Sequence, residues 1–212
     1  MMIFDIYRLL LDYFGFQNWW PVHQGQDKVV EITVGAVLTQ NTSWKNVERA
    51  IENLIYKDTL SFEKILKMPI EELEYLIKPA GFYKRKSLTL KEVSKLFLNS
   101  KEINRQNLLT IKGVGKETAD SILLYALDKP YFVIDSYTKR VFSRVGFCEE
   151  DISYDELQKV ITNSIPKDLE IYKEFHALIV QHCKIFCKKK PNCLNCPVAE
   201  KCKTFKTSLF TF

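Results

Sequence analysis

Glycine, proline and histidine are scarce in this chain, which has 7 glycines, 7 prolines and 3 histidines among 212 residues. So few turn-forming residues exclude a sandwich or barrel of short strands, and apolar residues recur at helical spacing over most of the length. Hydrophobic residues make up 46% of the chain, enough to fill a folded core. We therefore expect a folded protein of the all-α class.

Long hydrophobic runs are also missing. No apolar stretch approaches the roughly 18 residues that a membrane span requires. Residues 1–15 include Asp5, Arg8 and Asp12, so this segment is predicted to be an amphipathic helix rather than a signal peptide. The sequence predicts a cytoplasmic protein with no membrane partner.

Negative charge is nearly absent from residues 182–212, which contain seven lysines and one glutamate, although the whole chain has a net charge of only +5. The positive charge is therefore local. Such a cluster suits binding to a polyanion, and it equally suits a solvated tail that keeps the protein soluble.

The first two thirds of the chain lacks cysteine, and five of the six cysteines lie within residues 183–202. A compact array is formed by Cys187, Cys193, Cys196 and Cys202. A reducing cytoplasm disfavours disulfides, and structural zinc sites more often pair two C-x2-C hooks across a longer spacer. The spacing therefore favours a cubane iron–sulfur cluster and leaves zinc as an alternative. Cys183 is expected to be a core thiol on a helix.

Helical patterns separated by short connectors are predicted at 3–15, 27–40, 43–56, 60–66, 70–78, 84–97, 105–110, 116–127, 136–145, 154–163 and 168–184. A brief extended run at 131–134 precedes Asp135. The segment from Lys188 on is predicted to be loop-like and to depend on bound metal for its order.

Two of the seven glycines, Gly113 and Gly115, lie in one turn just before a predicted helix. Glycine permits positive φ and close approach of the backbone to a ligand, and the amides at a helix start bind anions. Lys116 adds a positive charge, so the turn is a candidate phosphate site. An ordinary corner with a glycine cap is the alternative, but the small pair Thr118 and Ala119 favours two closely packed helices.

The hairpin, the aspartate in Val133-Ile134-Asp135-Ser136 and the terminal four-cysteine loop together resemble the helix-hairpin-helix DNA glycosylases of the endonuclease III type. The resemblance spans nearly the whole chain. It implies a two-lobed all-helical fold, with a six-helix lobe at 25–130 that carries the hairpin at about 105–127. A discontinuous second lobe is implied at 1–24 and 131–212.

The resemblance also implies the ligands. The partner would be double-stranded DNA containing damaged bases, bound by a nucleoid-associated monomer with the everted base between the lobes. The cofactor would be a 4Fe-4S cluster within 187–202, held by the four cysteines of the array. The loop differs from the usual pattern because five residues, not six, separate Cys187 from Cys193.

Asp135 is the candidate catalytic residue. Breaking a glycosidic bond passes through an oxocarbenium-like state, which a carboxylate near the sugar stabilises while it orients or deprotonates a water. An aspartate at this place is also a common helix N-cap. The resemblance favours the catalytic role.

Glu117 occupies the position at which bifunctional family members carry a Schiff-base lysine. A carboxylate cannot form an imine. Lys116 is rotated by roughly 100° on the helix and is expected to face phosphate. The sequence therefore predicts a monofunctional DNA N-glycosylase without AP lyase activity.

The candidate base pocket comprises Trp19, Trp20, Pro21 and Trp44. Tryptophans usually belong to cores, but indoles also bind a positively charged purine by stacking and cation–π attraction. The Trp-Trp-Pro stretch, the Gly-Ala-Val-Leu-Thr-Gln-Asn-Thr segment at 35–42 and Gly81-Phe82-Tyr83 are similar to the 3-methyladenine glycosylase branch. We expect an alkylated purine as substrate.

Gln40 and Phe82 match family residues that fill the space of the flipped nucleotide and wedge the opposite strand, and they join Gly113, Gly115 and Lys116 as expected DNA contacts. The alternatives are a pyrimidine-directed or mismatch-directed glycosylase, with or without lyase activity, and a non-catalytic DNA-binding or redox-sensing module.

Overall fold

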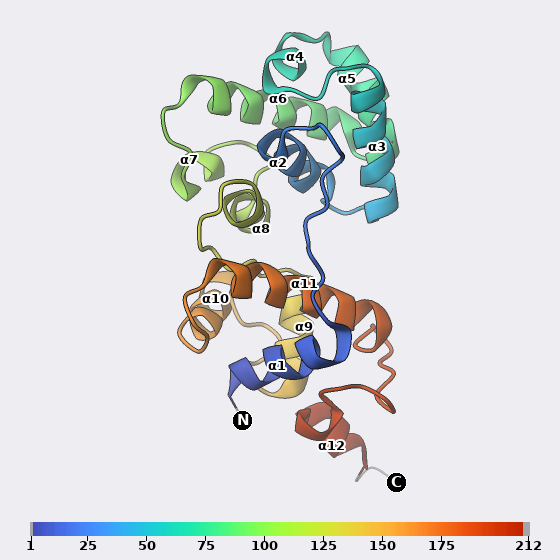
Figure 1. Cartoon of the computed structure of the whole chain (residues 1–212), viewed down its shortest axis with the longest axis vertical. Helices are drawn as coiled ribbons and strands as arrows, with labels where there is room; N and C mark the ends of the chain where they lie inside the picture. The colour runs from blue at the N-terminus through green and yellow to red at the C-terminus, as the bar shows by residue number, and fades with distance from the viewer. Residues whose placement is uncertain (1, 210–212) are drawn as a thin grey trace. The chain divides into compact units, whose positions relative to one another are not determined.

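The computed structural model describes residues 2–209, and every regular element within that range is a helix. The helices gather into two compact units (Figure 1). The middle unit is Trp20–Lys129, and the terminal unit combines the residues up to Trp19 with those from Pro130 on. The all-α prediction is confirmed. None of the helices in the described range is long and apolar enough to cross a membrane.

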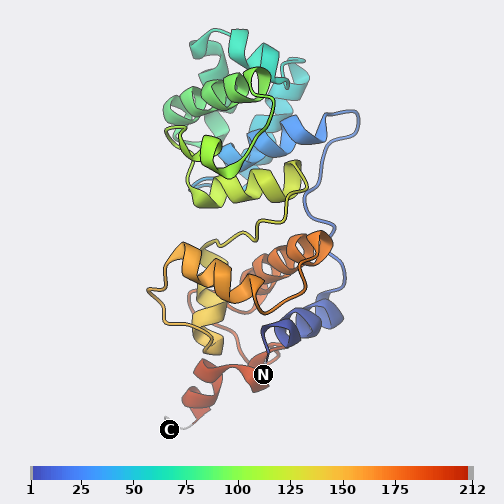
Figure 2. The same cartoon turned by 90° about the vertical axis from the view of Figure 1, so that its left-hand side faces the viewer.

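The middle unit is built around one apolar helix, α2. Its elements are α2 (Lys28–Leu38), α3 (Trp44–Tyr56), α4 (Phe62–Lys67), α5 (Ile70–Ile77), η1 (Lys78–Ala80), α6 (Tyr83–Asn99), α7 (Arg105–Leu109), α8 (Lys116–Ser121) and η2 (Ile122–Ala126). Every residue of α2 from Val30 to Leu38 is buried, including Glu31 and Thr33, and a helix buried on all sides needs neighbours on all sides. Accordingly α3, α6, α8 and η2 surround it (Figure 2).

The terminal unit is built around α11. Its elements are α1 (Ile3–Phe14), α9 (Ser136–Val145), α10 (Tyr154–Thr162), α11 (Leu169–Ile185), η3 (Ala199–Lys201) and α12 (Lys203–Leu209). The helices α1 and α9 pack on α11, and Phe175 of α11 touches the rings of Tyr7, Phe132 and Phe142. This aromatic core fixes the start of α9, where Asp135 lies.

Two predicted elements need correction. The segment after Lys188 is not wholly loop-like, because it ends in the helix α12, which packs on α9. The predicted helix at 116–127 changes to a π-helix at Ile122, and all five residues of this π-helix are buried. Local sequence patterns do not report such packing against distant elements.

Candidate functional site

Asp135 is the N-cap of α9. Its Oδ1 accepts hydrogen bonds from the backbone N of Thr138 at 2.7 Å and from Thr138 Oγ1 at 2.8 Å. Its Oδ2 lies 3.6 Å from Nε2 of His176 on α11, and the side chain of Asp135 is 13% exposed. One carboxylate oxygen is thus occupied by the cap, while the other faces an imidazole and keeps limited access to solvent.

Burial acts to raise the pKa of Asp135, but the adjacent His176 imidazole and the hydrogen bonds from Thr138 outweigh it. The net effect lowers the pKa below its usual value, so the carboxylate is ionised at neutral pH. The sequence reasoning missed His176 in this role. No local pattern points to it, because only the packing of α9 on α11 brings the two side chains together.

The hairpin joins α7 to α8, and an ion pair holds the two helices together. Arg105 Nε donates to Asp120 Oδ1 at 2.7 Å and its Nη2 donates to Oδ2 at 3.1 Å. Asp120 is fully buried and Arg105 is only partly exposed, so the carboxylate of this bidentate pair is shielded from water. In the turn between the helices, Gly113 has φ +96°, and a Cβ there would lie 2.4 Å from Thr89 Oγ1. Only glycine fits this position.

Gly115 differs from Gly113. Its φ of −92° suits any residue, and an added Cβ would meet no atom within 4 Å. Lys116 and Glu117 follow it in the first turn of α8, and all three residues are exposed. The tip of the hairpin therefore presents backbone amides and an open surface to any ligand that approaches.

Gln40 and Phe82 lie at one small cavity of about 100 Å³, which Gly113 also lines. Gln40 Nε2 donates to Gly113 O and to Thr118 Oγ1, both at 2.9 Å. Phe82 is 63% exposed and has a left-handed backbone with φ 46°. The structure thus brings together three of the residues expected to contact DNA.

The tryptophans divide between the units. Trp20 packs edge-to-face on Trp44 at 5.3 Å and on Tyr125 at 5.6 Å between ring centroids. A Cβ on Gly35 would approach the Trp20 ring to 3.0 Å, so glycine makes room for this indole. Trp19 belongs to the terminal unit, where Lys184 Nζ lies 5.9 Å from the centroid of its ring. Pro21 is exposed. Sequence reasoning did not single out Tyr125.

All four cysteines of the array line one small cavity in the terminal unit. The other lining side chains are mostly apolar, and the polar ones nearest the sulfurs are hydrogen-bond donors. Arg144 Nη1 lies 3.4 Å from Cys187 Sγ, and His182 Nε2 lies 3.1 Å from Cys196 Sγ. This donor set suits negatively charged sulfur. Within residues 2–209, no three His, Cys, Asp or Glu side chains lie close enough to share a single metal ion.

Cys183 is buried on α11 and does not line that cavity. Its Sγ lies 3.7 Å from the carbonyl oxygen of Tyr137, and it hydrogen-bonds to Cys187. This hydrogen bond lowers the pKa of Cys187, although burial opposes the effect. The expectation of a core thiol on a helix agrees with this placement.

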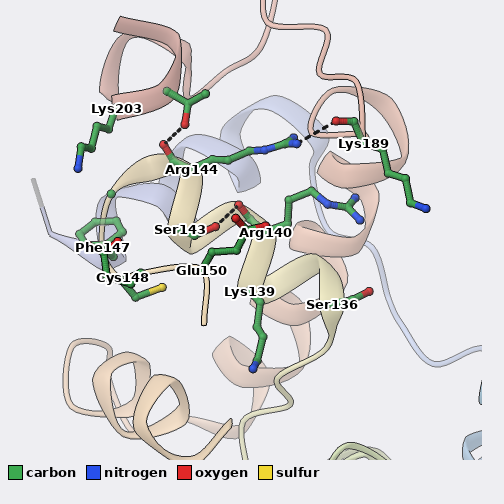
Figure 3. Close-up of a pocket in the computed structure, with 13 residues that line it drawn as sticks. Ser136, Lys139, Arg140, Ser143, Arg144, Phe147, Cys148, Glu150, Lys189 and Lys203 are labelled. Atoms are coloured by element: carbon green, nitrogen blue, oxygen red, sulfur yellow. Dashed lines mark hydrogen bonds between the residues drawn. The ribbon is translucent and has the colours of Figure 1, made fainter. Parts of the chain in front are cut away.

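A basic pocket of about 910 Å³ lies beside α9 in the terminal unit (Figure 3). Its cationic side chains are Lys139, Arg140, Arg144, Lys189 and Lys203. Arg144 Nη2 donates to the carbonyl oxygen of Lys189 at 2.9 Å, which ties the cysteine loop to α9. The spacing of the α9 cations along the helix was the available signal, but the sequence analysis assigned positive charge only to the tail and to Lys116 of the hairpin.

Comparisons with known proteins agree with this architecture. Residues 34–167 match the HhH-GPD superfamily base excision DNA repair protein family. A Methanocaldococcus jannaschii protein assigned as a DNA repair glycosylase is 55% identical, over 95% of this chain and 96% of that protein. Endonuclease III of Bacillus subtilis is 28% identical over 82% of this chain and 80% of its own.

Solved structures are also similar to this chain. The H. pylori 3-methyladenine DNA glycosylase bound to 1,N6-ethenoadenine has a TM-score of 0.75 and 31% identity, covering 87% of this chain and 98% of that one. A non-covalent endonuclease III–DNA complex has a TM-score of 0.84 and 24% identity, covering 98% of this chain and 96% of that one, and shows the shared fold. The helical fold, the family match over residues 34–167 and the 55% identical relative together define a DNA repair glycosylase. The chain belongs to the HhH-GPD superfamily.

Proposed function

We propose that this glycosylase hydrolyses the N-glycosidic bond of an alkylated purine in double-stranded DNA and leaves an abasic site. The substrate assignment is supported by the likeness to the H. pylori 3-methyladenine DNA glycosylase, which covers 98% of that chain. It is also supported by the aromatic group of Trp20, Trp44 and Tyr125. Electron-rich rings bind a cationic purine more strongly than a neutral base, because cation–π attraction adds to stacking. Pro21 follows Trp20 directly in the middle unit, and we assign it to the same pocket.

The observation that carries the proposal is the ionised carboxylate of Asp135. Its lowered pKa makes it a weak base but a permanent negative charge. Such a charge stabilises the positive charge that develops on the sugar as the bond breaks. Oδ1 is held by Thr138, so Oδ2 is the atom left to face the sugar or to orient the attacking water.

An alkylated purine is already positively charged and leaves as a neutral base. It therefore needs little protonation by the enzyme, and a weakly basic carboxylate is sufficient. An oxidised or mismatched pyrimidine is a poorer leaving group and would demand stronger acid catalysis.

Glu117 carries the prediction that no lyase step occurs. It stands in the first turn of α8 at the position where the bifunctional pattern has a lysine, and its carboxylate cannot form an imine. Lys116 is its neighbour along an exposed turn, and we assign it to phosphate together with the amides that follow Gly113 and Gly115.

For DNA contacts outside the hairpin we propose Gln40 and Phe82. Unstacking a base costs a few kcal/mol, and inserted side chains offset part of that cost. The exposed ring of Phe82 suits a wedge, and Gln40 suits polar contact with the bases left behind. The cations of the pocket beside α9 add phosphate contacts.

We propose that Cys187, Cys193, Cys196 and Cys202 hold a 4Fe-4S cluster. These four side chains line one cavity with hydrogen-bond donors at two of the sulfurs. Their spacing has a single C-x2-C pair between two five-residue arms, unlike the two separated hooks usual in structural zinc sites. The bound cluster would supply cross-links that order the loop. Arg144 then connects the loop to α9.

Base release from defined oligonucleotides tests the proposed reaction. Duplexes carrying an alkylated purine, thymine glycol, uracil or a mismatch are incubated with the protein and analysed with and without alkali. We expect release of the alkylated purine, with strand breaks only after alkali, because hydrolysis leaves the abasic site intact.

Strand cleavage without alkali, together with a borohydride-trapped adduct that Lys116→Ala abolishes, would identify an endonuclease III-type lyase instead. Release from thymine glycol alone would overturn the alkylpurine assignment. An absence of base release from every duplex, with DNA binding retained, would favour the non-catalytic module.

The choice of Cys187 over Cys183 as cluster ligand gives a second prediction. Cys187→Ser is expected to lose iron and visible absorbance and to make the segment after Lys188 sensitive to protease, because the loop loses a cross-link. Cys183→Ser is the matched control and is expected to keep all three properties. Iron and sulfide analysis together with absorbance spectra shows whether each variant still holds the cluster, since zinc has no visible absorbance. The reverse pattern would assign Cys183 as the ligand.

A further inference from the structure

Lys86 is a buried lysine on α6 that joins two separate segments of the middle unit. It is 4% exposed. Its Nζ donates to the carbonyl oxygens of Leu38 at 2.8 Å, Gln40 at 2.8 Å and Ala80 at 2.9 Å. Leu38 ends α2, and Ala80 ends η1. One ammonium group thus uses its three N–H bonds on the two segments that carry Gln40 and Phe82.

Gln40 is held at both ends. Its backbone carbonyl accepts from Lys86, while its side chain donates to Gly113 O and Thr118 Oγ1 in the hairpin. Thr89 lies one turn after Lys86 on α6, and its Oγ1 is 3.1 Å from the carbonyl oxygens of both Lys112 and Arg85, so its one O–H bond is shared between them. One face of α6 therefore contacts three segments around the cavity that Gln40 and Phe82 line, namely 38–41, 80–82 and the hairpin turn at 112–113.

Phe82 needs such support. Its left-handed backbone is unfavourable for a large residue and persists only where the surroundings impose it. The carbonyl of Ala80, two residues earlier, is fixed by Lys86, and Gly81 between them has φ +69°. An apolar residue at position 86 would leave three carbonyls without this donor, those of Leu38 and Ala80 in buried surroundings. Burying a lysine is unfavourable unless such bonds compensate.

We propose that Lys86 is a positioning residue that fixes segments 38–41 and 80–82 in one arrangement, so that Gln40 and Phe82 enter the DNA duplex together. The inference rests on the proposed DNA contacts of these two residues, not on which base is removed. Lys86 itself touches neither DNA nor the reacting atoms.

Lys91 supplies a matched control on the same helix. Its Nζ also donates to three carbonyl oxygens, those of Ile65, Leu66 and Met68, at 3.2, 2.9 and 2.5 Å. These carbonyls lie at the end of α4, which carries none of the proposed DNA contacts. The variants Lys86→Met and Lys91→Met therefore remove the same kind of contact from different places.

The test measures binding to a duplex with a tetrahydrofuran abasic analogue and to the same duplex without it. We expect Lys86→Met to lose about tenfold or more of the preference for the abasic duplex, with little change for the intact one. Lys91→Met is expected to keep the preference. An unchanged preference in Lys86→Met, or an equal loss in Lys91→Met, would overturn the inference.

A pH series on the native chain keeps the test decisive if Lys86→Met fails to fold. Burial lowers the pKa of Lys86 to about 8. A neutral amine has two N–H bonds for three acceptors, so one carbonyl loses its donor as the pH rises through that value. Arg85 is the other ionisable residue among those lining this cavity.

We expect the preference of the native chain for the abasic duplex to fall between about pH 7 and 9, around the pKa of about 8. In the double variant Gln40→Ala/Phe82→Ala, no such pH-dependent fall is expected. A flat profile in the native chain, or the same fall in the double variant, would refute a positioning role. The abasic probe carries no base, so this binding test does not depend on which base the enzyme releases. A failed test of alkylpurine release would leave the role of Lys86 standing, and a failed test of Lys86 would leave the proposed reaction standing.

Discussion

Asp135→Asn is expected to reduce base release by a factor of about 10² to 10⁴, the range typical of a positioned acid–base or charged group. Asparagine caps helices as well as aspartate does, so α9 and the hydrogen bonds from Thr138 are retained. The variant loses only the negative charge. Single-turnover kinetics should therefore show slow base release. A separate duplex-binding assay should show unchanged affinity for DNA.

Asp168→Asn is the matched control. Asp168 is the N-cap of α11 and accepts from the backbone N of Ile171 at 2.9 Å, so it has the same structural role in the same unit. Its variant should release bases at the native rate. Full activity in Asp135→Asn, or an equal loss in Asp168→Asn, would mean that Asp135 serves only as a cap. Because the pKa of Asp135 is lowered by the adjacent His176 and the hydrogen bonds from Thr138, native activity should show no loss attributable to this group until the pH falls below the usual aspartate range.

Gly113→Ala is expected to lower the free energy of unfolding by about 2 to 4 kcal/mol, because it combines an unfavourable backbone with a steric clash. The backbone has φ +96°, and the new Cβ would lie 2.4 Å from Thr89 Oγ1. Urea denaturation followed by circular dichroism measures the change. Thr89→Ala in the same chain removes the clash but not the φ strain, so the double variant should recover part of the loss.

Gly115→Ala separates folding from binding in the same turn. Its backbone is extended and nothing lies within 4 Å of the added Cβ, so stability should change by less than about 1 kcal/mol. We expect weaker DNA binding, since the methyl group obstructs close approach of a phosphate. Equal stability losses at the two positions would contradict the roles assigned to these glycines.

Much of the fold could be predicted from the sequence because its signals are local. The start of α9 after an extended apolar run, the two-glycine turn and the crowded cysteines each lie within a short window. Several of these features depend on backbone conformation and helix periodicity, which neighbouring residues largely determine. The helix α12 and the π-helix at Ile122–Ala126 were missed because contacts with distant elements decide them.

In the candidate site, the features that local sequence determines are separated even more clearly from those that distant contacts determine. The sequence by itself determined which side chains we propose for the chemistry, among them Asp135, Glu117 and the cysteines, because reactivity belongs to the side chain. Only the tertiary structure decided their surroundings: His176 beside Asp135, Tyr125 beside Trp20, and Lys86 beneath the segments that carry Gln40 and Phe82. These contacts join residues far apart in the chain, and packing against a common core, rather than any local pattern, brings them within a few ångströms.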